Sequence, residues 1–248
     1  MNIGAQLYTT RNLMKTPEGI HSTLERVAAI GYKYIQCSGF TFDAAEMKEI
    51  CDGLGLAVRL THTPGNRILF ETRDVIREHL LMECPYVGIG GFPGEHTIAG
   101  AREFLETFTP AMKELRTAGL KFQYHNHAYE FEAQPEGGDI WSVLVNESEP
   151  DLMGFTLDVM WAQHAGRNVA ELIHGLRGRI QVCHLKDMVM DDSNPLFAAV
   201  GSGVLEWPGI LGAFEAIGTE YGFVEQDNCY EKDPLDELEA SYKFLSNK

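Results

Sequence analysis

Four apolar runs in the second half of the sequence each end in a side chain that can bind a metal ion. The runs end at His125 or His127, at Asp158, at His184 and at Glu225. Imidazole nitrogens combined with carboxylate oxygens suit Mn²⁺, Mg²⁺, Co²⁺ or Zn²⁺. Groups of this kind at one depth would bury charge without compensation unless a cation lay among them. These residue types therefore predict one divalent metal site, provided that the fold brings the four runs together.

A repeating unit of one strand and one helix would bring the runs together. Short apolar strand candidates alternate with longer amphipathic stretches from one end of the sequence to the other. The expected strands are residues 2–8, 34–37, 58–61, 86–89, 121–124, 154–157, 180–183 and 223–224. The expected helices are residues 17–30, 42–54, 97–118, 168–176, 207–217 and 234–247. The long connection over residues 187–203 is expected to be a loop.

Eight strand units in one chain predict the α/β class and a single (β/α)₈ TIM barrel. The 248 residues suit one such domain over residues 1–248, because barrels of this kind routinely reach about 250 residues. A doubly wound open sheet gives a similar string of elements, but no GxGxxG follows a strand, and no nucleotide cofactor is expected. In a parallel barrel the carboxyl ends of all strands meet in one bowl, where the active site lies. The candidate ligands would converge there.

Alternation along a strand gives the direction of each side chain. His125 and His127 share one face, so spacing does not separate them, and we take His125 as the ligand and His127 as a substrate contact. Lys186 shares the parity of His184. It could bind a substrate oxygen or stabilise an enolate, although a surface lysine fits the pattern equally well.

Three further residues are candidates for the walls of the site. His62 ends the third expected strand and Glu130 lies in the loop after the fifth, where each could form hydrogen bonds to substrate hydroxyls. Trp161 could supply an apolar wall, or simply pack in the core. Five histidines lie on expected helices or loops, and most of them are expected at the surface; the five are His21, His79, His96, His164 and His174. The adjacent aspartates 191 and 192 are expected in an exposed acidic turn.

The charge of the chain narrows its possible partners. Twenty Lys and Arg residues against 36 Asp and Glu residues give a formal charge of −16, which opposes attraction to a phosphate backbone. Nucleic acid is therefore not an expected partner. The five cysteines are odd in number and lack CxxC spacing, which fits a reducing cytosol. No signal peptide or membrane span is expected, since no apolar run reaches about 18 residues.

The candidate residues lie in sequence runs that carry a family resemblance. The runs are QLYTTR (6–11), YHNHAYEF (124–131), LDVMW (157–161), HLKD (184–187), GSG (201–203) and VEQD (224–227). They resemble the xylose isomerase-like barrels, which include sugar phosphate isomerases and epimerases, inosose dehydratases and hydroxypyruvate isomerases. The resemblance covers nearly the whole chain and implies Asp158, His184 and Glu225 as metal ligands. Gln6, in the first run, joins the candidate substrate contacts.

The fifth strand departs from the pattern of the epimerases in this superfamily. Those epimerases have a glutamate ligand there, whereas this sequence has His125. The departure puts a mechanism with two opposed glutamate bases in doubt and favours a single base or a dehydratase-type reaction.

The resemblance implies a metal-dependent sugar isomerase or epimerase that removes a proton next to a carbonyl of a small sugar or keto-polyol. Glu225 or a histidine of the HNH run would be the base, and Lys186 or His62 would contact the carbonyl oxygen. The alternative is a dehydratase or lyase that eliminates from a 3-keto sugar, keto-glycoside or inosose.

Two functions of other classes carry less weight. An apurinic endonuclease would need several zinc ions and a basic face, against which the charge of −16 argues. A non-catalytic carbohydrate-binding subunit would not need candidate ligands on four strands. The expected substrate lacks phosphate, because Lys186 is the obvious basic residue near the last two strands, and a homo-oligomer is possible.

Overall fold

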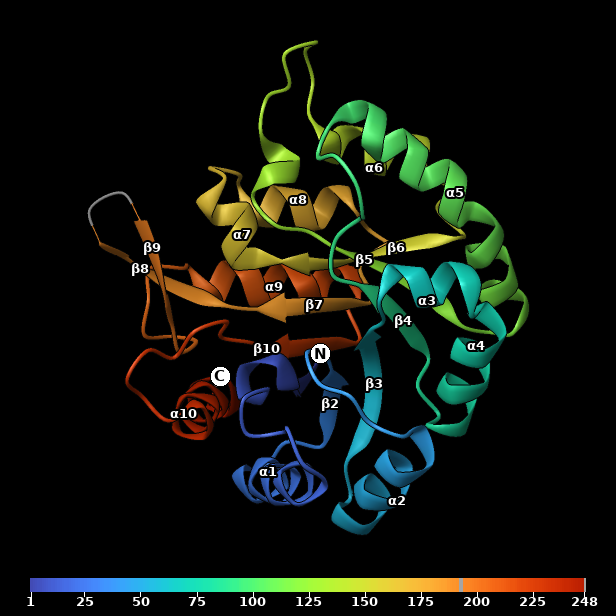
Figure 1. Ribbon diagram of the computed structural model, residues 1–248. Helices are drawn as coiled ribbons and strands as arrows, with labels where there is room; N and C mark the ends of the chain where they lie inside the picture. Colours follow the sequence, from blue (N-terminus) through green and yellow to red (C-terminus); the bar gives the residue numbers. More distant parts are fainter. Residues whose placement is uncertain (192–193, 248) are drawn as a thin grey trace.

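Within residues 1–191 and 194–247, which the computed structural model describes, eight parallel strands close into a barrel (Figure 1). In barrel order the strands are β1 (Asn2–Gln6), β2 (Tyr34–Cys37), β3 (Ala57–His62), β4 (Tyr86–Ile89), β5 (Lys121–His125), β6 (Met153–Asp158), β7 (Val182–Leu185) and β10 (Tyr221–Val224). The pairing of Asn2 with Tyr221 joins β1 to β10 and closes the sheet. The predicted TIM barrel is confirmed.

Helices lie outside the strands (Figure 1). They are α1 (Pro17–Ile30), α2 (Ala44–Leu54), α3 (Gly65–Phe70), α4 (Thr72–Leu81), α5 (Ile98–Thr117), α6 (Ile140–Glu147), α7 (Val159–His164), α8 (Val169–Gly175), α9 (Trp207–Ile217) and α10 (Pro234–Ser246), with 3₁₀ turns at η1 (Leu7–Thr10) and η2 (Tyr129–Phe131). The six predicted helices are present within two residues of their expected ends. Helices α3, α4, α6 and α7 were not predicted.

Capping residues at the helix ends explain where several helices start and stop. The side chain of Asp43 accepts hydrogen bonds from the backbone N–H groups of Ala45 and Glu46 at the start of α2, as an N-cap does. Gly55 ends the same helix with a positive φ of 67°, a conformation that glycine adopts without steric cost. Local sequence therefore sets the bounds of the helix.

Two apolar layers fill the fold. Inside the barrel, Leu60, Tyr86, Val182 and Phe223 form a small buried cluster. Gly4 makes room for it, because a Cβ atom there would lie 2.7 Å from the ring of Phe223. A larger buried cluster lies between the strands and the helices. Apolar side chains thus fill the lower barrel and leave polar residues to its carboxyl end.

The segment after β7 differs from its predicted loop. Strands β8 (Asp187–Asp191) and β9 (Asn194–Ala198) form an antiparallel hairpin that projects from the barrel (Figure 1). Exposed Asp191 ends β8, and Asp192, assigned to an acidic turn, lies outside the described residues. No helix in the described part of the chain is long and apolar enough to cross a membrane.

Candidate metal centre

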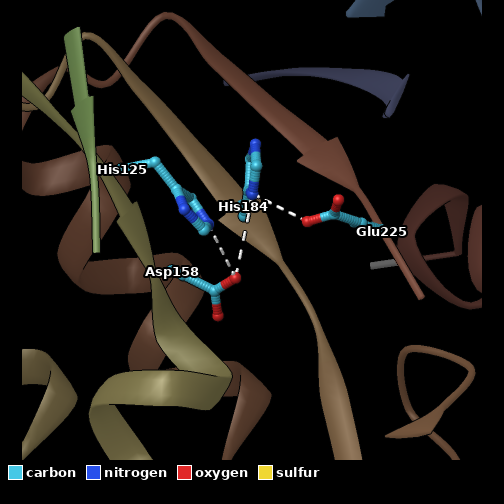
Figure 2. A group of neighbouring side chains, drawn as sticks. All are labelled: His125, Asp158, His184 and Glu225. Atoms are coloured by element: carbon cyan, nitrogen blue, oxygen red, sulfur yellow. Dashed lines mark hydrogen bonds and ion pairs between the residues drawn. The ribbon is translucent and has the colours of Figure 1, made fainter. Parts of the chain in front are cut away.

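Four candidate ligands from neighbouring strands meet at the carboxyl end of the barrel (Figure 2). His125 and Asp158 end β5 and β6, His184 lies on β7, and Glu225 follows β10. Their nitrogen and oxygen ligand atoms all lie within 4.8 Å of one another, and all four residues are buried. The register explains the meeting, because Asp158 pairs directly with His184. The cluster suggests a divalent metal site.

The distances and the unused hydrogen-bonding capacity of the cluster fit a metal ion. His184 Nδ1 lies 2.9 Å from Glu225 Oε2 and 3.7 Å from Asp158 Oδ2, which is 3.3 Å from His125 Nε2. Metal bonds of about 2.0–2.2 Å place neighbouring ligand atoms roughly 3–4 Å apart. Within the described residues, buried His184 Nδ1 and Glu225 Oε2 make no hydrogen bond. Apart from the ion pair between Glu225 Oε2 and Lys186 Nζ, 2.9 Å apart, both atoms have electron pairs available for a cation.

A hydrogen bond from β2 fixes the tautomer of His184. Its Nε2 lies 2.8 Å from the side-chain oxygen of Gln36, which can only accept. In the neutral ring Nε2 therefore carries the proton, and Nδ1 has the lone pair that a metal needs. Sequence reasoning missed Gln36, although a glutamine within the short apolar run 34–37 was a possible signal.

The first turn of α7 holds the carboxylate of Asp158. Its Oδ1 accepts hydrogen bonds from the N–H groups of Met160 and Trp161. The backbone N–H of Asp158 donates to the side-chain oxygen of Asn126. One carboxylate oxygen thus caps the helix, and Oδ2 remains for the cluster.

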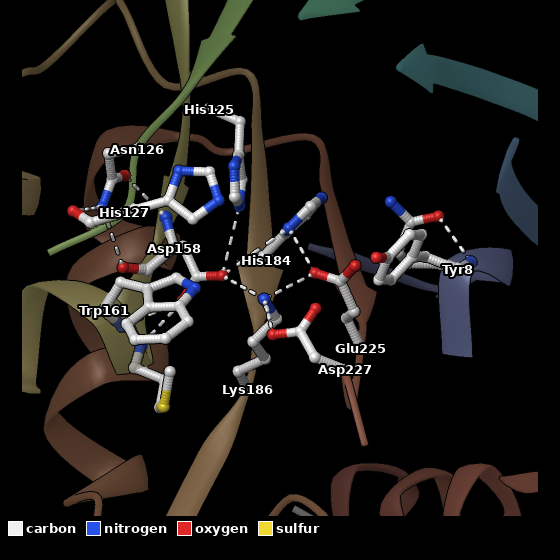
Figure 3. A network of polar contacts seen from close by, with 12 residues as sticks. Tyr8, His125, Asn126, His127, Asp158, Trp161, His184, Lys186, Glu225 and Asp227 are labelled. Atoms are coloured by element: carbon white, nitrogen blue, oxygen red, sulfur yellow. Dashed lines mark hydrogen bonds and ion pairs between the residues drawn. The ribbon is translucent and has the colours of Figure 1, made fainter. Parts of the chain in front are cut away.

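A buried lysine supplies positive charge beside the cluster (Figure 3). Lys186 is 1% exposed, so it is not a surface residue. Its Nζ lies 3.0 Å from Asp158 Oδ2, 2.9 Å from Glu225 Oε2 and 2.8 Å from Asp227 Oδ2. Burial alone would lower the pKa of Lys186, but the three carboxylates outweigh it and hold the pKa well above its usual value. Lys186 is therefore an ammonium ion.

The three carboxyl groups beside this lysine differ in the direction of their pKa shifts. Burial opposes ionisation of Asp158 and Glu225, yet the Lys186 ammonium and the neighbouring histidines together outweigh it, and the pKa of each lies below its usual value. Burial, followed by the charge of Glu225, raises the pKa of Asp227 to about 6. Asp158 and Glu225 are thus charged at neutral pH, as metal ligands must be.

Neutral histidines surround the cluster. Burial lowers the pKa of His125 to about 4, that of His127 to about 3, and that of His62 well below its usual value. The ring of His62 lies 5.1 Å from that of His125 and 5.3 Å from that of His184. Neutral imidazoles can bind a metal or accept a proton.

The cluster opens into a cavity of about 390 Å³. Its wall includes Tyr8, Ser38, His62, Thr63, His125, His127, Lys186, Glu225 and Asp227. His62 and His127 thus lie where a substrate would contact them. A cavity with a few converging polar groups is the usual form of a small-molecule site.

Three predicted substrate contacts lie outside this wall. Gln6 is fully buried, and its side-chain oxygen accepts from Tyr8 N. Glu130 is also fully buried and accepts from Tyr124 Oη and from His127 N. Burial raises the pKa of Glu130 to about 7. The ring of Trp161 lies 5.9 Å from the His127 ring, beside the cavity.

Other residues near the cavity had no predicted role. Asp227 stands in the VEQD run but was given none, and Tyr8 stands in QLYTTR. His79 belongs to the five histidines of which most were expected at the surface, and it is an exception, because it is 2% exposed. Helix α4 was not predicted, and its buried face includes Val75 and His79. Recognising that helix would have identified His79 as a buried residue.

Solved structures are similar to this chain over its whole length. A sugar phosphate isomerase/epimerase from Parabacteroides distasonis is 20% identical with a TM-score of 0.83, over 100% of this chain and 98% of that chain. AsbF, a probable 3-DHS dehydratase from Bacillus anthracis, is 10% identical with a TM-score of 0.77, over 100% of both chains. The IOLI protein with a bound zinc atom is 15% identical with a TM-score of 0.73, over 100% of this chain and 97% of that chain.

These identities are low, and the likeness concerns the fold. No protein-family model and no curated protein matches the sequence. The closed barrel and its likeness to solved structures agree with the resemblance seen in the sequence runs. The chain has the fold of the xylose isomerase-like TIM barrels.

Proposed function

We propose that the protein is a divalent-metal-dependent isomerase or epimerase that removes a proton beside the carbonyl of a small sugar or keto-polyol. The observation that carries this proposal is the buried cluster of His125, Asp158, His184 and Glu225, two of which, His125 and Glu225, line a cavity with other polar side chains. The similar protein from Parabacteroides distasonis is described as a sugar phosphate isomerase/epimerase, and the similar IOLI protein has a bound zinc atom. Both descriptions support the proposal.

The four cluster residues would hold the ion. When bound, a divalent cation polarises a carbonyl and makes the neighbouring C–H more acidic. His184 would bind through Nδ1, because Gln36 engages its Nε2. Mn²⁺, Mg²⁺, Co²⁺ and Zn²⁺ all accept two nitrogen and two oxygen donors.

Glu225 is the proposed base. It is ionised at neutral pH, belongs to the cluster and lines the cavity. The Lys186 ammonium, 2.9 Å from Glu225 Oε2, would stabilise negative charge that develops on the substrate oxygen. His127 is neutral and lines the same cavity, so it would return or remove a proton at the neighbouring carbon. His62 would contact the carbonyl or a hydroxyl.

The proposed substrate lacks phosphate. Among the described residues that line the cavity, Lys186 is the one permanent cation. Its ammonium is already engaged by three carboxylates. A phosphate dianion usually binds arginine forks, lysines or helix N-termini, so a neutral polyol suits this cavity better.

Elimination is the second candidate reaction, and the histidine on β5 favours it. With His125 in place of a carboxylate, Glu225 is the single cluster carboxylate on the cavity wall. Glu225 would remove a proton next to the carbonyl. The electron pair would form a C=C bond as the C–O bond one carbon further along breaks. The leaving hydroxyl would take the proton that Glu225 has accepted and depart as water, while neutral His127 would form a hydrogen bond to that hydroxyl. The similar AsbF is described as a probable dehydratase.

A reducing compartment such as the cytosol is also proposed. All five cysteines are free and buried. Structural disulfides characterise oxidising compartments, so free thiols support a reducing one.

Deuterium exchange tests the proposed reaction. The protein is loaded with Mg²⁺ or Zn²⁺ and incubated in D₂O with ketoses, 3-keto sugars and inososes, and proton NMR follows the C–H beside each carbonyl. We expect exchange in the wild type that is lost with a chelator and in Glu225→Gln. Exposed Glu103→Gln is the matched control and should exchange normally. Exchange at an undiminished rate in Glu225→Gln would contradict the role of Glu225. If no metal-loaded sample shows deuterium exchange, the proposed reaction is refuted.

A further inference from the structure

A chain of three side chains runs from the helix layer to the cavity wall. His79 on α4 is buried, and its Nδ1 lies 2.7 Å from the carbonyl oxygen of Val75. Its Nε2 lies 2.8 Å from Thr61 Oγ1. Thr61 Oγ1 in turn lies 2.8 Å from Thr63 Oγ1. Each of the two threonine hydroxyls carries one proton, and the neutral His79 ring carries one.

The direction of every hydrogen bond in this chain follows from its ends. A carbonyl can only accept, so His79 Nδ1 carries the proton. Burial lowers the pKa of His79 to about 4, which leaves Nε2 as an acceptor at neutral pH. Thr61 must therefore donate to His79. Because a hydroxyl has one proton, Thr63 must donate to Thr61.

This order leaves Thr63 Oγ1 with lone pairs and no proton for a further partner. Thr63 directly follows β3, and its backbone N–H donates to Gly88 O at 2.8 Å, which fixes its position against β4. Thr63 lines the cavity of the metal cluster and also a neighbouring cavity of about 180 Å³. It stands next to His62, which lines both cavities as well.

We propose that Thr63 is a specificity-determining residue whose oxygen accepts a hydrogen bond from a hydroxyl of the bound substrate. A carbonyl, carboxylate or ether oxygen at the same place has no proton to donate, so its lone pairs would face those of Thr63 Oγ1 and be repelled. Thr61 and His79 are positioning residues, since they act by consuming the proton of Thr63. The inference rests on the proposed function, because it assumes that the cavity binds a polyhydroxylated molecule.

Hexitols give a test that is independent of turnover, because they have no carbonyl beside which a proton could be removed. Binding of sorbitol, mannitol and galactitol to the Mg²⁺-loaded protein is measured by calorimetry, together with their monofluoro derivatives. Fluorine can accept a hydrogen bond but cannot donate one. Losing the donor at the Thr63 contact should weaken binding about 10- to 100-fold at one position of the hexitol.

Three variants separate the direction of the bond from simple packing. Thr63→Val should reduce binding of the parent hexitol to the level of the fluorinated one, and Thr63→Ser should restore the difference. Thr61→Val frees the proton of Thr63, so it should narrow the discrimination between hydroxyl and fluorine. Thr117→Val, at an exposed position on α5, should leave all affinities unchanged. Nitrogen NMR of His79 should find the proton on Nδ1 at neutral pH.

Several results would overturn the inference. These are wild-type affinity for a hexitol in Thr63→Val, equal affinities for hydroxyl and fluorine at every position, no binding of any hexitol, and a proton on Nε2 of His79. If deuterium exchange is observed together with one of these results, the role of Thr63 is refuted and the proposed reaction still stands. If the hexitols are discriminated as expected but no deuterium exchange occurs, the proposed reaction is refuted and the role of Thr63 still stands.

Discussion

Replacing Gln36 with leucine removes the acceptor that orients His184. In the wild type, His184 Nε2 and Gln36 Oε1 are 2.8 Å apart, and both residues are fully buried. Leucine leaves the Nε2–H group without a partner. The imidazole can then change tautomer and donate from Nδ1 to Glu225 Oε2, which lies 2.9 Å away. Either outcome weakens metal binding, because the ligand lone pair is disoriented or protonated.

The size of the effect follows from the burial of this pair. A buried donor left unsatisfied costs about 1–3 kcal/mol. Loss of an outer hydrogen bond to a histidine ligand typically reduces metal affinity about 10- to 100-fold, or about 1.4–2.7 kcal/mol. We therefore expect Gln36→Leu to bind zinc 10- to 100-fold more weakly, on the order of that typical loss. Gln36→Glu keeps an acceptor and should retain most of the affinity.

Competition with a coloured zinc chelator of known affinity measures this effect. Gln123→Leu is the matched control, since Gln123 is also a buried glutamine on a barrel strand but contacts Gln181 instead of the cluster. We expect it to bind zinc as the wild type does. If Gln36→Leu and Gln123→Leu have equal zinc affinities, His184 does not bind the metal through Nδ1 and the reasoning is refuted.

Two further predictions concern the buried ionisable side chains of Lys186 and His79. Lys186→Met should destabilise the metal-free protein by about 3–5 kcal/mol, because it leaves buried carboxylates unpaired. Thermal melts should show that zinc raises the Tm of this variant more than that of the wild type. An equal rise in both proteins would contradict the prediction. The pKa of His79 falls to about 4 on folding, chiefly through burial, so the unfolded chain binds its proton first as the pH falls below about 6.5. The resulting stability, about 3 kcal/mol at most, is present above pH 6.5 and is lost between pH 6.5 and 4. Urea unfolding with a chelator should therefore show a weaker pH dependence for His79→Phe in this range, and identical slopes would count against it.

The barrel could be predicted because its information is local. Apolar runs at strand spacing, glycines at helix ends and amphipathic stretches recur in order along the chain. The parity of β7 also put His184 and Lys186 on one face before any contact was known. In a parallel barrel, such local directions carry over to a common bowl.

Contacts between distant segments could not be predicted in the same way. Gln36 and His184 are 148 positions apart, and nothing in either strand alone pairs them. The burial of His79 depends on α4, whose helical pattern was missed. Glu130 looked like a substrate contact because it follows β5, but its side chain turns back to Tyr124 Oη and His127 N. Side-chain direction in loops depends on packing that spacing does not encode.

Anomalous X-ray diffraction from crystals grown with Mn²⁺ or Zn²⁺ tests the central claim most directly. We expect one strong peak among His125 Nε2, Asp158 Oδ2, His184 Nδ1 and Glu225 Oε2, at about 2.0–2.2 Å from each for zinc. The absence of a peak at saturating metal, or a peak bound by other residues while Lys186 alone neutralises the carboxylates, would contradict the metal centre and the chemistry proposed from it.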